Sequence, residues 1–87
     1  MKAGRVDEFY STKEGLIINL EEESGKITDE VLEKISNYAI FADFMYSKKV
    51  YSAIICHQNP AKQFEYYERS PSIIIKAHFI HIPQNEL

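Results

Sequence analysis

The sequence predicts a small α/β domain whose mixed sheet is built around a β-hairpin and one βαβ unit. Three observations lead to this fold class: an apolar stretch that ends in glutamates at 16–22, a stretch with helical periodicity at 29–46, and a second apolar stretch at 50–56. Strand, helix and strand in this order are typical of a parallel crossover. At 87 residues the chain is a single domain, 1–87, and its modest size also suits a piece of a longer chain.

The first part of the chain predicts the hairpin. Residues 5–10 include valine and an aromatic pair, as in a short strand, and the polar residues 11–15 end in a glycine that suits a turn. The second strand, 16–22, alternates at period two. One face carries Leu16, Ile18 and Leu20, and the other carries Ile17, Asn19, Glu21 and Glu23. Two of the three consecutive glutamates therefore share a face.

The helix is predicted over 29–46, with Thr28 as its N-cap and with Asp29 and Glu30 in the first turn, where they favour the helix dipole. Its expected core stripe is Val31, Leu32, Ile35, Tyr38, Ala39, Ala42 and Met45. The second half, 38–46, is apolar almost all round. That pattern indicates either burial on two sides or a partner surface, the simplest partner being a second copy in a homodimer.

The strand at 50–56 is apolar on both faces, as expected for an inner strand of a sheet that is covered on both sides. Its connection to 16–22 is expected to be right-handed. Residues 73–82 predict a last strand with Ile73, Ile75, Ala77 and Phe79 on one face. The structure of 58–71 stays open, because 64–69 suits either a short helix or a strand.

Composition and charge limit the classes of function. Ten basic and thirteen acidic residues give a net charge of -3, so any contact with nucleic acid must be local. The single cysteine excludes an internal disulfide, and a core role suits it better than a nucleophile paired with His57. Because no apolar run is long enough to cross a bilayer and no signal peptide is evident, we expect a cytoplasmic protein without membrane contact.

Paired carboxylates are the strongest chemical feature of the sequence. Glu21 and Glu23 would lie about 7 Å apart along one strand, and a third carboxylate from a neighbouring strand would complete an oxygen site for a hard cation such as Mg²⁺. The alternative is a strand that runs into an acidic, solvated turn. His78 and His81 are three residues apart in a strand, which places them on opposite faces and disfavours zinc.

The order of these features resembles a known family. It combines Asp7 in a short strand, the run Asn-Leu-Glu-Glu-Glu at 19–23, a helix with Lys34 and Tyr38, and the run Val-Tyr-Ser-Ala-Ile-Ile at 50–55. This pattern is similar to the PD-(D/E)XK nuclease superfamily, in particular its recombination-promoting, transposase-associated branch. The resemblance covers about residues 5–57.

The resemblance implies a restriction-endonuclease-like core and a metal-dependent DNA endonuclease, which hydrolyses phosphodiesters. Asp7 and Glu21 would bind Mg²⁺, and the residue at position 23 would assist the attacking water. The chain has Glu23 where the family carries lysine or glutamine, so Glu23 is either an extra metal ligand or the mark of an inactive site. The helix that precedes the aspartate strand in the family is missing, as in a truncated fold. The other functional hypothesis is a non-catalytic interaction or dimerisation module of the same fold.

Overall fold

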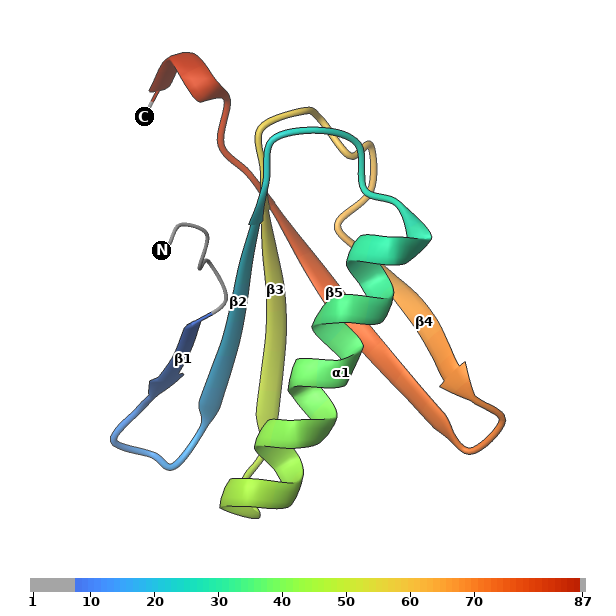
Figure 1. Ribbon diagram of the computed structural model, residues 1–87. Helices are drawn as coiled ribbons and strands as arrows, with labels where there is room; N and C mark the ends of the chain where they lie inside the picture. Colours follow the sequence, from blue (N-terminus) through green and yellow to red (C-terminus); the bar gives the residue numbers. More distant parts are fainter. Residues whose placement is uncertain (1–7, 87) are drawn as a thin grey trace, which may run out of the picture.

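The computed structural model describes residues 8–86, which form a five-stranded mixed sheet and one α-helix. In chain order the elements are β1 (Glu8–Ser11), β2 (Ile17–Glu23), α1 (Asp29–Tyr46), β3 (Val50–Cys56), β4 (Phe64–Ser70), β5 (Ile73–His81) and the 3-10 helix η1 (Gln84–Glu86). The strands are ordered β1-β2-β3-β5-β4 across the sheet (Figure 1). The predicted α/β class is therefore confirmed, including the hairpin β1-β2 and the unit β2-α1-β3.

The three inner strands of the sheet are parallel, and the two edge strands are antiparallel to them. β2 pairs with β3 from Ile17 opposite Val50 onwards, and β3 pairs with β5 from Ser52 opposite Ala77 onwards. β1 joins β2 through one hairpin and β4 joins β5 through another. Consequently the carboxyl ends of β2, β3 and β5 lie at the same end of the sheet. The segment whose structure the sequence left open contains β4.

Local signals set both ends of α1. Thr28 Oγ1 accepts a hydrogen bond of 3.3 Å from the backbone N–H of Val31, as an N-cap does. At the other end Ser47 adopts the left-handed conformation, and its N–H donates to the carbonyl oxygen of Asp43 at 2.9 Å. The predicted bounds of the helix and its N-cap are confirmed.

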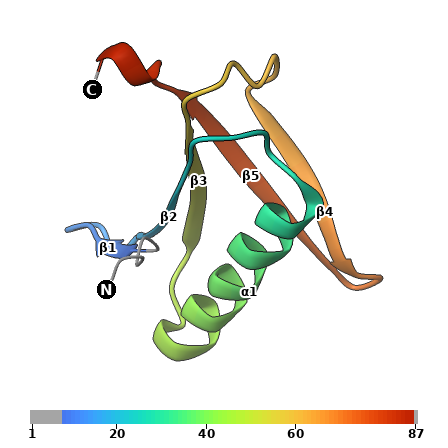
Figure 2. The ribbon, with the colours of Figure 1, turned by 45° about the horizontal axis from the view of Figure 1, so that its top comes forward.

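The helix covers one face of the sheet (Figures 1 and 2). Between the helix and the sheet lies a cluster of buried side chains formed by Leu32, Ile35, Ile54, Cys56 and Ala77. No helix among residues 8–86 covers the other face, which we call the open face. The prediction of a sheet covered on both sides is therefore wrong for the described part of the chain, although Cys56 is buried as expected.

On β2 the more polar face is the more deeply buried one. The helix-facing side carries Asn19 and Glu21, which are only 1% and 4% exposed. The more apolar side, with Ile18 and Leu20, turns to the open face and is half-buried. Because folding alone would favour the reverse, a strand that buries polar groups under a helix is a candidate for function.

The core stripe predicted for α1 is only partly correct. Leu32, Ile35, Ala39 and Ala42 are buried as predicted, and Val31 is half-buried. Tyr38 and Met45 are exposed instead, because the C-terminal half of the helix has less of the sheet to pack against. Phe9 of β1 reaches this half, with its ring centroid 6.0 Å from that of Tyr38 and 6.3 Å from that of Phe41. Phe44 is almost fully exposed.

Candidate functional site

Glu21 is a buried carboxylate at the carboxyl end of β2, facing α1. Its Oε2 lies 3.1 Å from Nζ of Lys34 on the helix. Its Oε1 is buried and has no hydrogen-bond partner among the described residues. A buried carboxylate needs both a countercharge and hydrogen-bond donors or a cation to offset the lost hydration. Lys34 supplies the countercharge, and Oε1 remains available for a hydrogen-bond donor or a cation.

Glu23 lies two residues further along, on the same face of β2 by strand alternation. Its Oε2 accepts a hydrogen bond of 3.1 Å from the backbone N–H of Gly25, which stabilises the turn after the strand. The side chain is half-buried. Glu23 thus combines a structural contact with a place beside Glu21, as the pairing of carboxylates on one face predicted.

Asn19 fixes the strand beneath these carboxylates. Its side-chain Nδ2 donates to the carbonyl oxygen of Ile35 at 3.0 Å and to Oγ of Ser52 at 3.2 Å. One amide therefore connects β2 to the helix and to β3, which sets the position of Glu21 relative to Lys34. Strand alternation placed Asn19 on the same face as Glu21 and Glu23, but the sequence did not predict that this face would be the buried one.

His57 and Glu22 form a second polar contact at the same end of the sheet. The Nε2 of His57 lies 2.6 Å from Oε2 of Glu22, and its Nδ1 lies 2.8 Å from the carbonyl oxygen of Ile82. The hydrogen bond to Glu22, followed by that to Ile82, raises the pKa of His57 above its ordinary value. Glu22 alternates away from Glu21 and Glu23. This pair was not predicted from the sequence, because its two residues are 35 positions apart and meet only once β2 and β3 are parallel.

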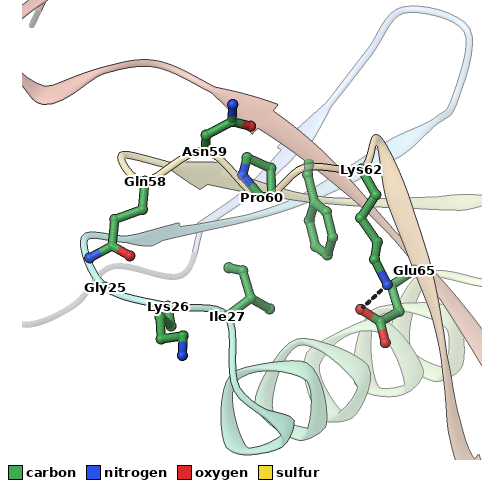
Figure 3. Close-up of a pocket in the computed structure, with 9 residues that line it drawn as sticks. Gly25, Lys26, Ile27, Gln58, Asn59, Pro60, Lys62 and Glu65 are labelled. Atoms are coloured by element: carbon green, nitrogen blue, oxygen red, sulfur yellow. Dashed lines mark hydrogen bonds and ion pairs between the residues drawn. The ribbon is translucent and has the colours of Figure 1, made fainter.

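A pocket of mixed polar and apolar lining lies next to the N-terminal end of α1 (Figure 3). It has a volume of about 290 Å³ and is formed by the loops that follow β2 and β3, together with residues of β4 and β5. Its lining residues are Gly25, Lys26, Ile27, Gln58, Asn59, Pro60, Lys62, Glu65 and Phe79. This end of an α/β sheet is a common place for ligands. Glu21 and Glu23 do not line the pocket, and Lys62 is engaged with Glu65 at 3.4 Å.

The predicted site residues are only partly within the described chain. Asp7 lies outside residues 8–86, whereas Glu21 and Glu23 share the helix-facing side of β2 as expected. Within the described residues no group of three or more histidine, cysteine, aspartate or glutamate side chains could hold a metal ion. The convergence of Asp7 with the two glutamates therefore stays a prediction.

Comparison of the chain with protein-family models, with curated proteins and with solved structures finds no match in any of the three. The resemblance to the nuclease superfamily therefore rests on the sequence pattern alone. Within residues 8–86 no helix is long and apolar enough to cross a membrane.

Proposed function

We propose that the chain is a metal-dependent DNA endonuclease domain with a restriction-endonuclease-like core, in which Glu21 is the central metal ligand. The observation that supports this proposal most is the buried Glu21 carboxylate, which has one oxygen on Lys34 and the other without a partner in the described part of the chain. A buried carboxylate oxygen without a partner is costly to a folded protein. Burial of an incompletely compensated carboxylate is typical of sites that bind a ligand or a cation.

The residues at this position have the donor chemistry that a hard cation requires. Glu21 and Glu23, together with Asp7, would hold Mg²⁺ through carboxylate oxygens. Bound Mg²⁺ supplies activation of water and neutralisation of phosphodiester charge. Lys34 provides a countercharge for the Glu21 carboxylate, with Nζ 3.1 Å from Oε2. Glu23 adds negative charge, which strengthens cation binding but disfavours an anionic substrate.

The experiment compares metal binding and DNA cleavage in matched variants. Wild type is melted in EDTA, in Mg²⁺ and in Mn²⁺, and supercoiled plasmid is incubated under the same conditions. We expect millimolar metal to raise the melting temperature, because a ligand that binds only the folded state stabilises it. Glu21→Gln keeps the shape of the side chain but should abolish both the stabilisation and the cleavage. Glu33→Gln, an exposed glutamate on α1, is the control and should behave as wild type.

The outcomes separate three cases. Metal-dependent stabilisation with cleavage supports the nuclease. Stabilisation without cleavage identifies a domain that binds metal but is catalytically inactive, as Glu23 in place of lysine or glutamine would explain. A melting temperature that does not respond to either metal, together with Glu21→Gln equal to Glu33→Gln, would remove the metal site and the nuclease proposal with it.

One observation favours the second function, a dimerisation module. The helix segment 38–46 carries exposed aromatic and thioether side chains, namely Tyr38, Phe41, Phe44, Met45 and Tyr46. Clusters of this kind on a small domain are typical of protein contacts. A second copy of the chain is the simplest partner.

A further inference from the structure

The open face of the sheet carries a group of aromatic and cationic side chains on β3, β5 and β4. We call Tyr51, Phe64, Tyr66, Lys76 and His78 the aromatic platform. The strand register brings them together, since Phe64 lies opposite His78 and Tyr66 lies opposite Lys76 in the antiparallel pair of β4 and β5. Tyr66 is 59% exposed, and Tyr51 and Phe64 are each about 40% exposed. The platform is thus a surface and not a part of the core.

The side chains of the platform are ordered by contacts with one another. The rings of Tyr51 and His78 are stacked, with centroids 4.2 Å apart and planes 10° from parallel. Nζ of Lys76 lies 4.2 Å from the ring centroid of Phe64 and 5.8 Å from that of Tyr66. Burial of His78, followed by the nearby charge of Lys76, lowers the pKa of His78 below its ordinary value. This shift favours the neutral form of the stacked imidazole, which presents a flat aromatic group.

Two hollows adjoin the platform. One, of about 480 Å³, is bounded by Tyr51, Phe64, Lys76, His78 and Ile80. The other, of about 650 Å³, is lined by Tyr51, Lys76 and His78 and also by Ala39, Ile40 and Asp43 of α1. Lys49 also lines this second hollow. Flat groups can therefore rest on the exposed rings, with ammonium groups within reach of the same ligand.

We propose that the aromatic platform binds single-stranded nucleic acid by stacking of bases on its rings, with Lys76 and Lys49 contacting phosphate. Open sheets that present aromatic side chains are a general solution for single strands, because every base has a π-face and the backbone supplies the charge. Lys76 decides between this ligand and a second copy of the chain. Within residues 8–86 Lys76 forms no ion pair, and its Nζ lies over the rings of Phe64 and Tyr66. A face-to-face dimer would bury this ammonium group, which is costly without a countercharge, whereas a phosphate would neutralise it.

The proposed binding does not depend on the metal site. The platform lies on the opposite face of the sheet from Glu21, and none of its residues contacts Glu21, Glu23 or Lys34 in the interactions described above. Binding can therefore be measured in EDTA, where a failed metal site has no influence. Binding of a single strand in EDTA would support the platform even if the nuclease proposal fails. Metal-dependent cleavage would likewise support the nuclease even if the platform does not bind.

The experiment measures fluorescence anisotropy of a labelled oligothymidylate in EDTA, with a duplex of equal length as competitor. We expect the single strand to bind more tightly than the duplex, and Tyr66→Ala and Lys76→Ala each to weaken binding about tenfold. Tyr66→Phe should bind as wild type, since the ring and not the hydroxyl stacks. The controls are Phe44→Ala, an exposed aromatic on the helix, and Lys13→Ala, an exposed lysine in a turn. Circular dichroism confirms that each variant is folded.

Salt dependence provides a second readout. With two phosphate contacts, the logarithm of the affinity should fall with the logarithm of salt concentration with a slope of about -1.4, or about 0.7 per contact. Equal binding by Tyr66→Ala and wild type, or no binding of wild type at millimolar protein, would overturn the proposal. So would a wild-type dimer in sedimentation that Tyr66→Ala converts to a monomer, because the platform would then be a contact between copies.

Discussion

His57 connects the ends of β2, β3 and β5 through its two ring nitrogens. A protonated imidazole donates to both acceptors, the Glu22 carboxylate at 2.6 Å and the Ile82 carbonyl oxygen at 2.8 Å. A neutral ring has one N–H and can donate to only one of them. The charged form is therefore the one that holds the chain after β5 against the ends of β2 and β3, and the strength of this contact depends on pH.

The stability of the protein should accordingly depend on the protonation of His57. Because the folded-state pKa is raised above the ordinary 6.5, the contribution of His57 is fully present below about pH 6.5 and is lost as the pH rises through the folded-state pKa. Nuclear magnetic resonance of the imidazole ring protons measures that pKa directly. Glu22→Gln should lower it towards the ordinary value, since the hydrogen bond to Glu22 is the largest cause of the shift.

The matching stability measurement uses urea denaturation across the same pH range. Wild type should lose stability above about pH 6.5 more steeply than His57→Gln, in which this titration is absent. Parallel stability profiles for the two proteins would show that the contact with Glu22 does not persist in solution.

Individual site residues could be predicted only as far as strand alternation reaches. The shared face of Glu21 and Glu23 follows from their spacing in β2, and so does the separation of Glu22 from both. Which face is buried could not be predicted, because the more apolar side of β2 suggested the reverse. The ion pair of Glu21 with Lys34 and the contact of Glu22 with His57 depend on tertiary packing, which no local pattern encodes.

The ends of α1 illustrate how one element is delimited. Thr28 supplies a side-chain acceptor at the start, and Ser47 ends the helix in the left-handed conformation with φ of 52°. A non-glycine residue in this region pays a steric cost of about 1–2 kcal/mol. Glycine would therefore fit the end of the helix better than Ser47 does.

Substitution of Ser47 by glycine should stabilise the protein. Glycine removes the steric strain of the left-handed conformation, but its greater entropy in the unfolded chain offsets part of this gain. We therefore expect the free energy of unfolding to rise by about 0.5–1 kcal/mol. Urea denaturation measures it. Gly15→Ala is the opposite test, because Gly15 has φ of 88° and open space where a Cβ would lie. It should lose about 1 kcal/mol from backbone strain alone; an unchanged value for both variants would contradict this account.

Elements with a clear period or cap were predictable, and those without were not. The helix bounds followed from Thr28 and the apolar spacing, and the parallel pair of β2 and β3 followed from two apolar strands on either side of a helix. β4 was not resolved because its sequence, Phe-Glu-Tyr-Tyr-Glu-Arg-Ser, places aromatic and charged residues on both faces. Its pairing with β5 settles an ambiguity that local propensity leaves open.

At the scale of the whole molecule, a single helix on a five-stranded sheet leaves much aromatic surface exposed. The helix segment 38–46 contributes Ala39, Ile40 and Asp43 to the larger hollow beside the aromatic platform, whereas the exposed Phe44 is not among the residues that line it. Phe44, at 81% exposure, is the most exposed large apolar side chain described. Phe44 does not contribute to the core, so its replacement should not destabilise the fold.

Replacement of Phe44 by glutamate tests association through segment 38–46. If this segment forms a dimer, Phe44→Glu should produce a folded monomer, because a charge placed in an apolar interface is costly whereas an exposed one is not. Sedimentation velocity gives the oligomeric state, and circular dichroism verifies the fold. Lys13→Glu, in the turn between β1 and β2, also makes the protein more negative but alters no side chain of the segment, so it should leave the dimer intact. A wild type that is monomeric at millimolar concentration would end the dimer hypothesis.

The position of β3 in the centre of the sheet has a consequence for the order of folding. Both hairpins and the helix close over short stretches of chain, whereas β3 must meet β2 across 33 residues, as the contact of Asn19 with Ser52 shows. We expect the closing of that loop to be slower than formation of either hairpin, because it costs more chain entropy. Until it is complete, an apolar strand with two unsatisfied edges is accessible to other chains. The same strand that unites the native sheet is therefore the segment most exposed to misassembly while the protein is being made.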